Sequence, residues 1–203
     1  MDKTLHIVTE QIQNDGTDTY YCHRYEPSPY SVLDYIFTEY PLSKSDVLID
    51  FGCGMGRLNF YLNHRFHCKT IGVELNPVYY EACIKNNASY HRHTKGAKEQ
   101  ATYPDIRFYH ESADSYVVDD TINHFYFFNP FSIEIFRKVI DHIYESLDRV
   151  SRSVTLLLYY PDAEYTYYLD TCTPFDLITE IPLSGYAKNV QERVVVYRYC
   201  HDL

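Results

Sequence analysis

The segment DVLIDFGCGMGR, residues 46–57, joins an apolar strand to three closely spaced glycines and then to a helix-like run. Gly52, Gly54 and Gly56 permit the positive backbone angles of a tight turn, and they leave no side chain between the backbone and a ligand. The N–H groups at the start of the next helix are a ready binding site for such a ligand. The segment therefore predicts a strand–loop–helix unit with a ligand over the loop.

A second acidic residue stands at the end of the next predicted strand. Glu74 follows Asp50 by 24 positions, and a carboxylate at this place in a doubly wound sheet accepts hydrogen bonds from a ribose. Arg57 or Asn59 occupies the third glycine of a dinucleotide fingerprint, and the GK[ST] ending of a phosphate-binding loop is missing. A glycine turn without a ligand would explain neither acid.

Strand-like and helix-like runs alternate from residue 46 onward. Such alternation predicts a largely parallel sheet with helices on both faces. The last two strand-like runs, joined without a helical period, should pair as an antiparallel hairpin at one edge. An amphipathic helix is expected upstream, over residues 31–40. The expected strands are 46–51, 69–74, 106–110, 122–128, 153–160, 175–183 and 192–200, and the later helices are 57–66, 77–90 and 132–150.

The run from Asp50 to Gly56 matches the pattern [DE]-x-G-x-G-x-G at every fixed position. In this respect the chain resembles the class I S-adenosylmethionine-dependent methyltransferases, and its GVELNP and YEPSPY segments look like those of small bacterial members. The resemblance covers about residues 19–200. It implies a doubly wound, Rossmann-like α/β sheet of seven strands, mostly parallel with an antiparallel C-terminal hairpin, and S-adenosyl-L-methionine as cofactor.

The resemblance also implies a domain organisation. The length of the chain, 203 residues, suits one domain. Within a single methyltransferase domain over residues 1–203, residues 1–45 would form an N-terminal lid and helix, and residues 46–203 the cofactor-binding core.

The family's cofactor contacts carry over to named positions of this sequence. Asp50 would orient the amino or carboxylate end of the cofactor, and the glycines would let the loop approach its methionine part. Glu74 would hold both ribose hydroxyls, with Leu75 packed on the adenine. The cofactor-binding residues implied are Tyr25, Tyr30, Asp50, Gly52, Cys53, Gly54, Gly56, Glu74, Leu75, Ser112, Ala113 and Asn129.

The stretch FYFFNPFS, residues 125–132, has two interpretations. Asn-Pro ends an apolar strand without any function, because proline removes a donor and restricts the residue before it. By resemblance, however, the stretch lies beside the transferred methyl group, where members that methylate base amines or glutamine amides carry [DNS]-P-P-[YFW]. We therefore predict Asn129, Pro130 and Phe131 as catalytic residues. The second proline is missing, which displaces the aromatic ring and weakens the inference of a nucleobase substrate.

Tyrosines flank the predicted ligand edge from two sides. Tyr25 and Tyr30 surround two prolines ahead of the first helix, where they would either close over the cofactor through cation–π contact or pack an N-terminal helix onto the domain. Tyr159 and Tyr160 follow the fifth core strand, at the carboxyl end of the sheet where ligands bind. They are candidates for the acceptor pocket.

The charge balance bears on the methyl acceptor. The chain has 28 acidic and 18 basic side chains, a formal net charge of -10, and scattered Lys and Arg, which disfavours a nucleic acid partner. We expect a small molecule or a protein amine as acceptor. The alternatives are the exocyclic amine of a nucleobase, a domain that binds the cofactor without catalysis and, less favoured, a nicotinamide-dependent oxidoreductase.

Two further expectations concern location and metal. No apolar run of signal-peptide or membrane-span length occurs, so we expect a cytoplasmic protein without a membrane partner. His64, His67 and Cys68 lie close together, but no second ligand pair has the spacing of a zinc site. We expect no metal.

Overall fold

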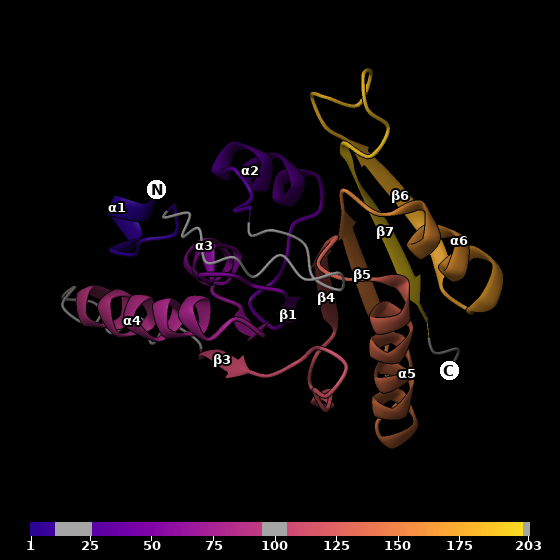
Figure 1. Cartoon of the computed structure of the whole chain (residues 1–203), viewed down its shortest axis with the longest axis horizontal. Coiled ribbons are helices and arrows are strands. Elements are labelled where there is room, and N and C mark those ends of the chain that lie inside the picture. The colour runs from indigo at the N-terminus through magenta and orange to yellow at the C-terminus, as the bar shows by residue number, and fades with distance from the viewer. Residues whose placement is uncertain (11–25, 95–104, 201–203) are drawn as a thin grey trace.

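The chain forms one mixed sheet with helices packed on both faces (Figure 1). The computed structural model describes residues 1–10, 26–94 and 105–200. The strand order across the sheet is β3-β2-β1-β4-β5-β7-β6. In chain order the elements are α1 (Asp2–Leu5), α2 (Tyr30–Glu39), β1 (Val47–Phe51), α3 (Arg57–Phe66), β2 (Lys69–Glu74), α4 (Pro77–Thr94), β3 (Ile106–His110), β4 (His124–Phe128), α5 (Ile133–Arg149), β5 (Val154–Tyr159), α6 (Ala163–Cys172), β6 (Asp176–Pro182) and β7 (Arg193–Tyr199).

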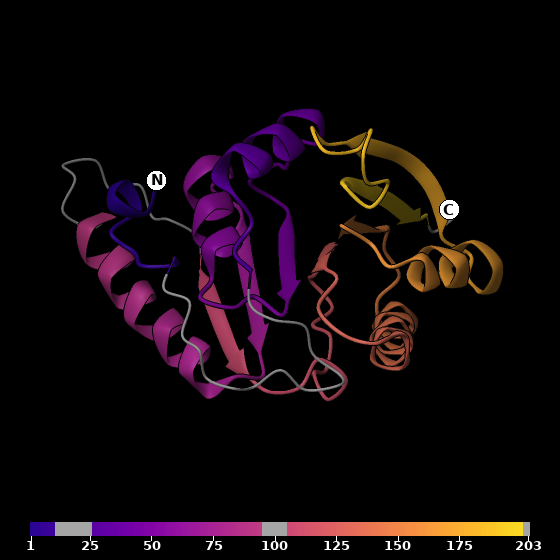
Figure 2. The ribbon, with the colours of Figure 1, turned by 45° about the horizontal axis from the view of Figure 1, so that its top comes forward.

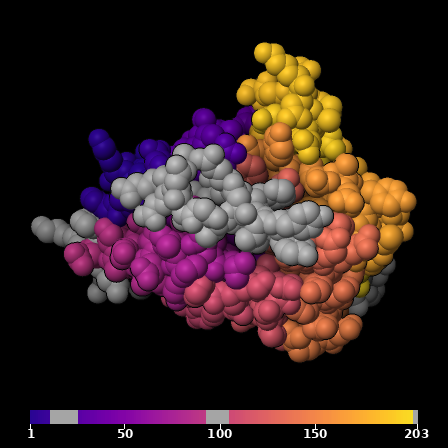
Figure 3. All heavy atoms as spheres, in the orientation of Figure 1, coloured from indigo at the N-terminus to yellow at the C-terminus, as the bar shows by residue number. Residues whose placement is uncertain are grey.

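The sheet is parallel except at its C-terminal edge. β1 pairs in parallel with β2 and β4, β2 with β3, and β4 with β5. β7 lies between β5 and β6 and is antiparallel to both, and the connection between β6 and β7 projects from the body (Figure 3). The predicted fold class is confirmed. The carboxyl ends of the parallel strands open on the edge where ligands bind in such sheets.

Helices lie on both faces of the sheet (Figure 2), and a large apolar cluster fills the space on each face. One joins β1, β4 and β5 to α5 and α6, and the other joins the opposite face to α2 and α3. A smaller cluster packs residues of α1, α3 and α4 with β3. The glycine loop therefore sits at the end of a strand that is buried on both sides.

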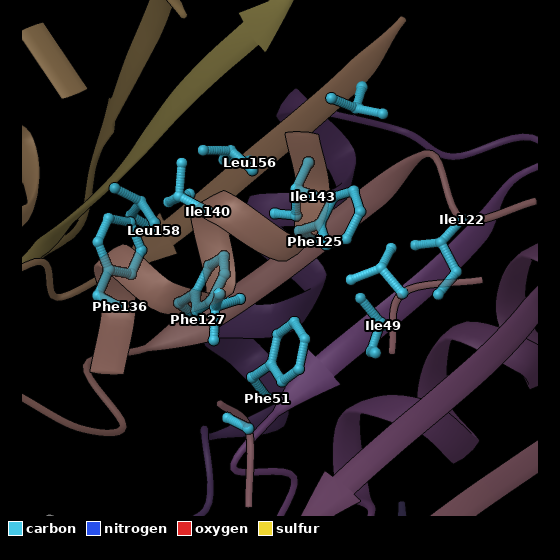
Figure 4. Packing of buried hydrophobic residues seen from close by; sticks show 14 of the residues in the cluster. Ile49, Phe51, Ile122, Phe125, Phe127, Phe136, Ile140, Ile143, Leu156 and Leu158 are labelled. Carbon is cyan, nitrogen blue, oxygen red and sulfur yellow. The ribbon is translucent and has the colours of Figure 1, made fainter. Parts of the chain in front are cut away.

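The aromatic run in β4 follows from this layering. Phe125 and Phe127 pack against Phe136 and Ile140 of α5 (Figure 4), while Tyr126 points to the opposite face, toward α2 and α3. A strand covered on both faces needs apolar side chains at every position rather than alternation. Packing alone therefore explains the three buried aromatics Phe125, Tyr126 and Phe127.

Two helices were not predicted. α6 begins after Asp162, whose side chain accepts a hydrogen bond from the Glu164 N–H, and it buries Tyr165 and Leu169 one turn apart. α1 is a single turn near the N-terminus. The other elements begin and end within a few residues of the predicted ranges. Among the described helices none is long and apolar enough to cross a membrane.

Gly72 offers a test of how tightly β2 is packed. A Cβ there would lie 2.6 Å from Cys53 Sγ and 2.7 Å from Phe108 Cδ1. We expect Gly72→Ala to lower the free energy of unfolding by about 1–3 kcal/mol, because overpacking forces both neighbours to move.

Urea denaturation followed by circular dichroism measures this change. Gly185→Ala is the matched control, because its Cβ would meet only the flexible side chain of Glu192, with Cγ at 2.8 Å. We expect Gly185→Ala to lower the free energy of unfolding clearly less than Gly72→Ala does. Equal small losses in both variants would contradict the packing described for β2.

Candidate functional site

The loop after β1 has a backbone that requires glycine. Gly52, Gly54 and Gly56 have φ of 79°, 55° and 82°, which L side chains rarely adopt. The Gly52 N–H donates to Val73 O at 2.9 Å, fastening the loop to the end of β2. A Cβ on Gly52 would lie 2.8 Å from Pro130 Cβ. The loop is therefore held between β2 and the segment that follows β4.

Glu74 is bound to this loop by its backbone. Its Oε2 accepts a hydrogen bond from the Gly54 N–H at 2.8 Å, and its Oε1 accepts one from the Asn76 N–H at 2.8 Å. Both Glu74 and Asp50 are buried. The two acids predicted from the sequence thus stand at the carboxyl ends of adjacent strands, on either side of the glycine loop.

Burial shifts the titration of both carboxyls. It raises the pKa of Asp50 to about 8, with a further contribution from the charge of Glu74. Burial also raises the pKa of Glu74 to about 7, although the backbone N–H groups that it accepts from act in the opposite direction. Neither a positive charge nor a hydroxyl donor is among the causes that shift the pKa of Asp50. A ligand that carries these groups would stabilise the ionised carboxyls.

Pro130 lies against the loop, and Asn129 immediately precedes it in the chain. Pro130 is the residue that would meet a Cβ on Gly52. Asn129 has φ of 39°, and its Oδ1 is buried with no hydrogen-bond partner among the described residues. A buried amide oxygen without a partner is costly, so this oxygen is a candidate acceptor for a ligand's N–H.

Phe131, predicted as catalytic, points into the core. Its side chain is only 5% exposed and meets Phe127 edge-on, with ring centroids 6.2 Å apart. Its carbonyl oxygen accepts a hydrogen bond from the Tyr165 hydroxyl. The ring is therefore occupied by packing, and Phe131 supports the position of the two residues before it.

The residues predicted to surround the adenine differ in exposure. Leu75 is 51% exposed beside Glu74, and its carbonyl contacts His110 Nε2 at 3.0 Å. Ser112 donates a hydrogen bond to the Asp114 carboxylate. Ala113 is buried in the cluster under α5. Leu75 is thus the one of these with a large apolar surface available to a flat ring.

The side chain of Cys53 points away from the ligand side of the loop. It is buried with Cys83 of α4, and both thiols approach the Gly54 carbonyl oxygen, at 3.8 Å for Cys53 and 3.0 Å for Cys83. Only the backbone of Cys53 remains for the predicted cofactor contact.

The two predicted N-terminal tyrosines fare differently. Tyr25 lies outside the described residues. Tyr30 begins α2, where its hydroxyl donates to Asp2 and its ring packs under the guanidinium of Arg57. Tyr30 therefore joins the N-terminal residues to the start of α3. The sequence pattern predicts no contact for Arg57, which only departs from the third glycine of a dinucleotide fingerprint.

The predicted acceptor-pocket tyrosines stand at the carboxyl end of β5. Tyr159 stacks on Phe128 with ring centroids 4.2 Å apart. Tyr160 has φ of 51°, and its hydroxyl accepts a hydrogen bond from Asn189 Nδ2 at 2.6 Å. The end of β5 is thus tied to the β6–β7 connection.

His64, His67 and Cys68 lie at the end of α3 and in the turn that follows it. His67 ends the helix in a left-handed conformation with φ of 54°, and Cys68 is buried. Across the described ranges no three His, Cys, Asp or Glu side chains are grouped as metal ligands.

The part of the chain that holds this site matches a known family model. Residues 49–142, which include Asp50, Glu74 and Asn129, match the model described as a methyltransferase domain. A sequence search of the curated proteins found no match.

The fold is shared with solved structures that include two proteins named as RNA methyltransferases and one named as a decarboxylase. An RNA methyltransferase from Salinibacter ruber, in complex with S-adenosyl-L-homocysteine, is 16% identical, with 86% of this chain and 93% of that chain covered and a TM-score of 0.58. A putative RNA methyltransferase from Pyrococcus horikoshii is 15% identical, with 100% and 98% covered and a TM-score of 0.60. A precorrin 8w decarboxylase from Methanobacterium thermoautotrophicum is 17% identical, with 87% and 93% covered and a TM-score of 0.57. At these identities the likeness establishes the fold alone.

A methyltransferase domain model thus matches residues 49–142, and the fold of the chain is shared with solved methyltransferase structures. Residues 50–56, which carry the pattern that predicted the cofactor, lie within the matched range. The roles of individual residues in binding and transfer stay predictions.

The buried acids make stability depend on pH. An acid whose pKa is higher in the folded than in the unfolded chain keeps its proton longer when folded, so its contribution to stability is lost as pH rises. For Glu74 the window runs from the ordinary value of 4.5 to about 7. We expect Glu74 alone to lower the free energy of unfolding of the ligand-free protein by roughly 2–3 kcal/mol across this window, and Asp50 to add to the fall.

Urea unfolding at pH 5, 6, 7 and 8 measures this slope. Glu74→Gln should make the slope shallower but not remove it, because Glu74 no longer titrates there while Asp50, with its pKa raised to about 8, still does. Glu81→Gln, on the exposed surface of α4, should leave it unchanged. A wild-type stability that rises with pH over this window would refute the assignment of raised pKa values.

Proposed function

We propose that this protein transfers the methyl group of S-adenosyl-L-methionine to an amine nitrogen, with residues 46–203 as the cofactor-binding core. The observation that carries this proposal is the close approach of Gly52 to Pro130. A Cβ placed on Gly52 would lie only 2.8 Å from Pro130 Cβ. It brings the cofactor loop and the Asn129 segment together with no side chain between them. Two substrates bound at these segments would therefore be in van der Waals contact.

The cofactor end of this site is built from the glycine loop and its acids. Glu74 would accept hydrogen bonds from the ribose hydroxyls, and Leu75 would cover the adenine, with Ser112 and Ala113 beyond it. Asp50 would face the cofactor's ammonium group. The raised pKa values of both acids support these roles, because a cation or hydroxyl donors would restore the ionised form that burial disfavours.

The acceptor end centres on Asn129. Its buried Oδ1 has no partner among the described residues, and it would accept a hydrogen bond from an amine N–H and so aim the nitrogen's lone pair at the cofactor. The bound cofactor supplies an activated methyl group. The protein's part is then alignment and exclusion of water rather than acid–base chemistry.

A small-molecule or protein amine fits the surroundings of this site better than nucleic acid. Phe131 is packed in the core, so its ring is not available to stack on a base. The charges of Glu192 and Glu26 contribute to raising the pKa of Tyr159 to about 12, after burial as the main cause. Carboxylates this close to the end of β5 would repel phosphates and favour an acceptor with positive charge.

Methylation of a nucleobase amine is the second candidate. It is supported by the Asn-Pro dipeptide after β4 and by relatives described as RNA methyltransferases, whose fold this chain shares at low identity. The stacked pair of Phe128 and Tyr159 offers an aromatic surface near the same strand ends. A domain that binds the cofactor without catalysis is the third alternative.

Glu74→Ala tests the cofactor assignment. We expect it to weaken binding of S-adenosyl-L-methionine by about 1–3 kcal/mol, the cost of removing a charged hydrogen-bonding partner. Isothermal titration calorimetry measures the dissociation constant, with Glu81→Ala as a surface control that should bind like the wild type. Unchanged affinity in Glu74→Ala would refute its ribose contact, and tight binding of NAD in place of S-adenosyl-L-methionine would refute the cofactor.

Asn129→Gly tests the transfer step. Glycine removes the amide but tolerates the left-handed backbone that Asn129 adopts. We expect the transfer rate to fall about 10–100-fold while cofactor affinity changes little, because the loss falls on acceptor alignment.

Transfer of tritium from labelled cofactor into fractionated lysate provides the measurement. Label in the small-molecule or protein fraction supports the amine proposal, and label in RNA or DNA supports the second candidate. Cofactor binding with no label above a no-enzyme control would favour the binding-only alternative.

A further inference from the structure

The Arg57 guanidinium is buried at the first residue of α3, immediately after the glycine loop. Its side chain is held from three directions: Nε donates to Thr9 Oγ1 at 2.7 Å, Nη1 donates to Ser28 O at 3.2 Å, and the guanidinium carbon lies 4.7 Å from the Tyr30 ring centroid. The residue as a whole is 6% exposed. Such a fixed, desolvated cation is unusual in a chain with net charge -10.

The contacts of Arg57 are fixed in turn by Asp2. The Asp2 carboxylate accepts hydrogen bonds from the Thr9 N–H at 2.7 Å and from the Tyr30 hydroxyl. Thr9 also donates its hydroxyl to Asp2 Oδ1 at 2.9 Å. Asp2, Thr9, Tyr30 and Arg57 therefore form a closed ring of contacts, which leaves the guanidinium little freedom to reorient.

One nitrogen of Arg57 is left over. Nη2 lies 3.4 Å from Glu10 Oε1, but the side chain of Glu10 is 75% exposed, and this contact lacks hydrogen-bond geometry. Nη2 is buried without a hydrogen-bond partner among the described residues. A buried guanidinium N–H in this state costs free energy unless something binds it.

Ser28 and Tyr126 connect Arg57 to the face of the sheet on which the Asp50 side chain lies. Asp50 is paired with Tyr126 across β1 and β4, and the Tyr126 side chain packs in the cluster between the sheet and α3. Ser28, whose carbonyl oxygen binds Arg57, lies beside the Tyr126 hydroxyl. Asp50 thus precedes the glycine loop and Arg57 follows it, while Glu74 binds the loop at Gly54.

We propose that Arg57 Nη2 binds the carboxylate of the cofactor's amino acid end, opposite the ammonium group that faces Asp50. This inference rests on the proposed cofactor. An amino acid end carries one negative and one positive group, and a buried acid before the loop and a buried cation directly after it match that pair. Charge-assisted hydrogen bonds of this kind are the strong ones.

A purely structural role makes a different prediction. If Arg57 only ties the N-terminal residues to α3, its loss weakens every ligand of the loop to the same extent. If it binds the carboxylate, its loss weakens only ligands that carry the amino acid end. Comparing a complete ligand with a truncated one separates the two.

Calorimetry on the full chain provides this comparison. S-adenosyl-L-homocysteine keeps the amino acid end, and methylthioadenosine lacks it while keeping the adenine and ribose. We expect Arg57→Met to weaken binding of S-adenosyl-L-homocysteine about 10–100-fold and to leave that of methylthioadenosine within about 2-fold. Arg57→Lys, which keeps the charge but loses the forked donors, should fall between the wild type and Arg57→Met.

Two further variants serve as controls. Arg65→Met removes the other arginine of α3, which binds Asp34 of α2 at 2.8 Å far from the loop, and it should not separate the two ligands. Thr9→Val removes the bond to Nε and leaves Arg57 in place. It should weaken S-adenosyl-L-homocysteine in the same selective way but to a smaller extent, and it serves if Arg57→Met fails to fold.

The outcomes are distinct. Equal weakening of both ligands in the Arg57 and Thr9 variants, or no weakening of either, would overturn the inference while leaving the cofactor intact. A wild-type protein that binds neither ligand would instead refute the proposed function.

Discussion

The close approach of Gly52 to Pro130 is the constraint on which the site depends. With no room for a Cβ between them, the loop after β1 and the turn after β4 fix each other's position. The bond from the Gly54 N–H to Glu74 then adds the end of β2 to the same unit. Three strand ends thus act as one rigid edge, and preorganisation of this kind is what a transfer reaction between two bound molecules needs.

The same edge is costly to the folded state. Two carboxyls are buried side by side with raised pKa values, and polar atoms of Asn129 and Arg57 are buried without hydrogen-bond partners in the described part of the chain. Replacing each of these polar side chains by an apolar one of similar volume would avoid this cost. Buried polar atoms without a hydrogen-bond partner also occur elsewhere among the described residues, at Asn87, Tyr144 and Arg193. The two carboxyls with raised pKa values, however, lie beside one loop, and this is the pattern expected where structure serves a ligand.

The sequence predicted the sheet well because strand ends there are marked locally. Apolar runs followed by glycine, proline or an acid gave the strands and placed Asp50 and Glu74 at adjacent ends. α6 was missed because its two buried residues are too few to show a helical period. The buried position of Phe131 and the contacts of Arg57 could not be predicted from the sequence. They depend on partners that are distant along the chain, Tyr165 for Phe131 and Thr9 for Arg57.

The left-handed residues at the ends of β4 and β5 have a consequence for protein engineering. Asn129 and Tyr160 both adopt positive φ, at a cost of order 1 kcal/mol each that glycine would avoid. A selection for thermal stability alone would favour glycine at both positions. It would thereby remove an amide from the proposed acceptor site and a hydroxyl that holds the neighbouring hairpin, so heat resistance and function would be selected in opposite directions at these two sites.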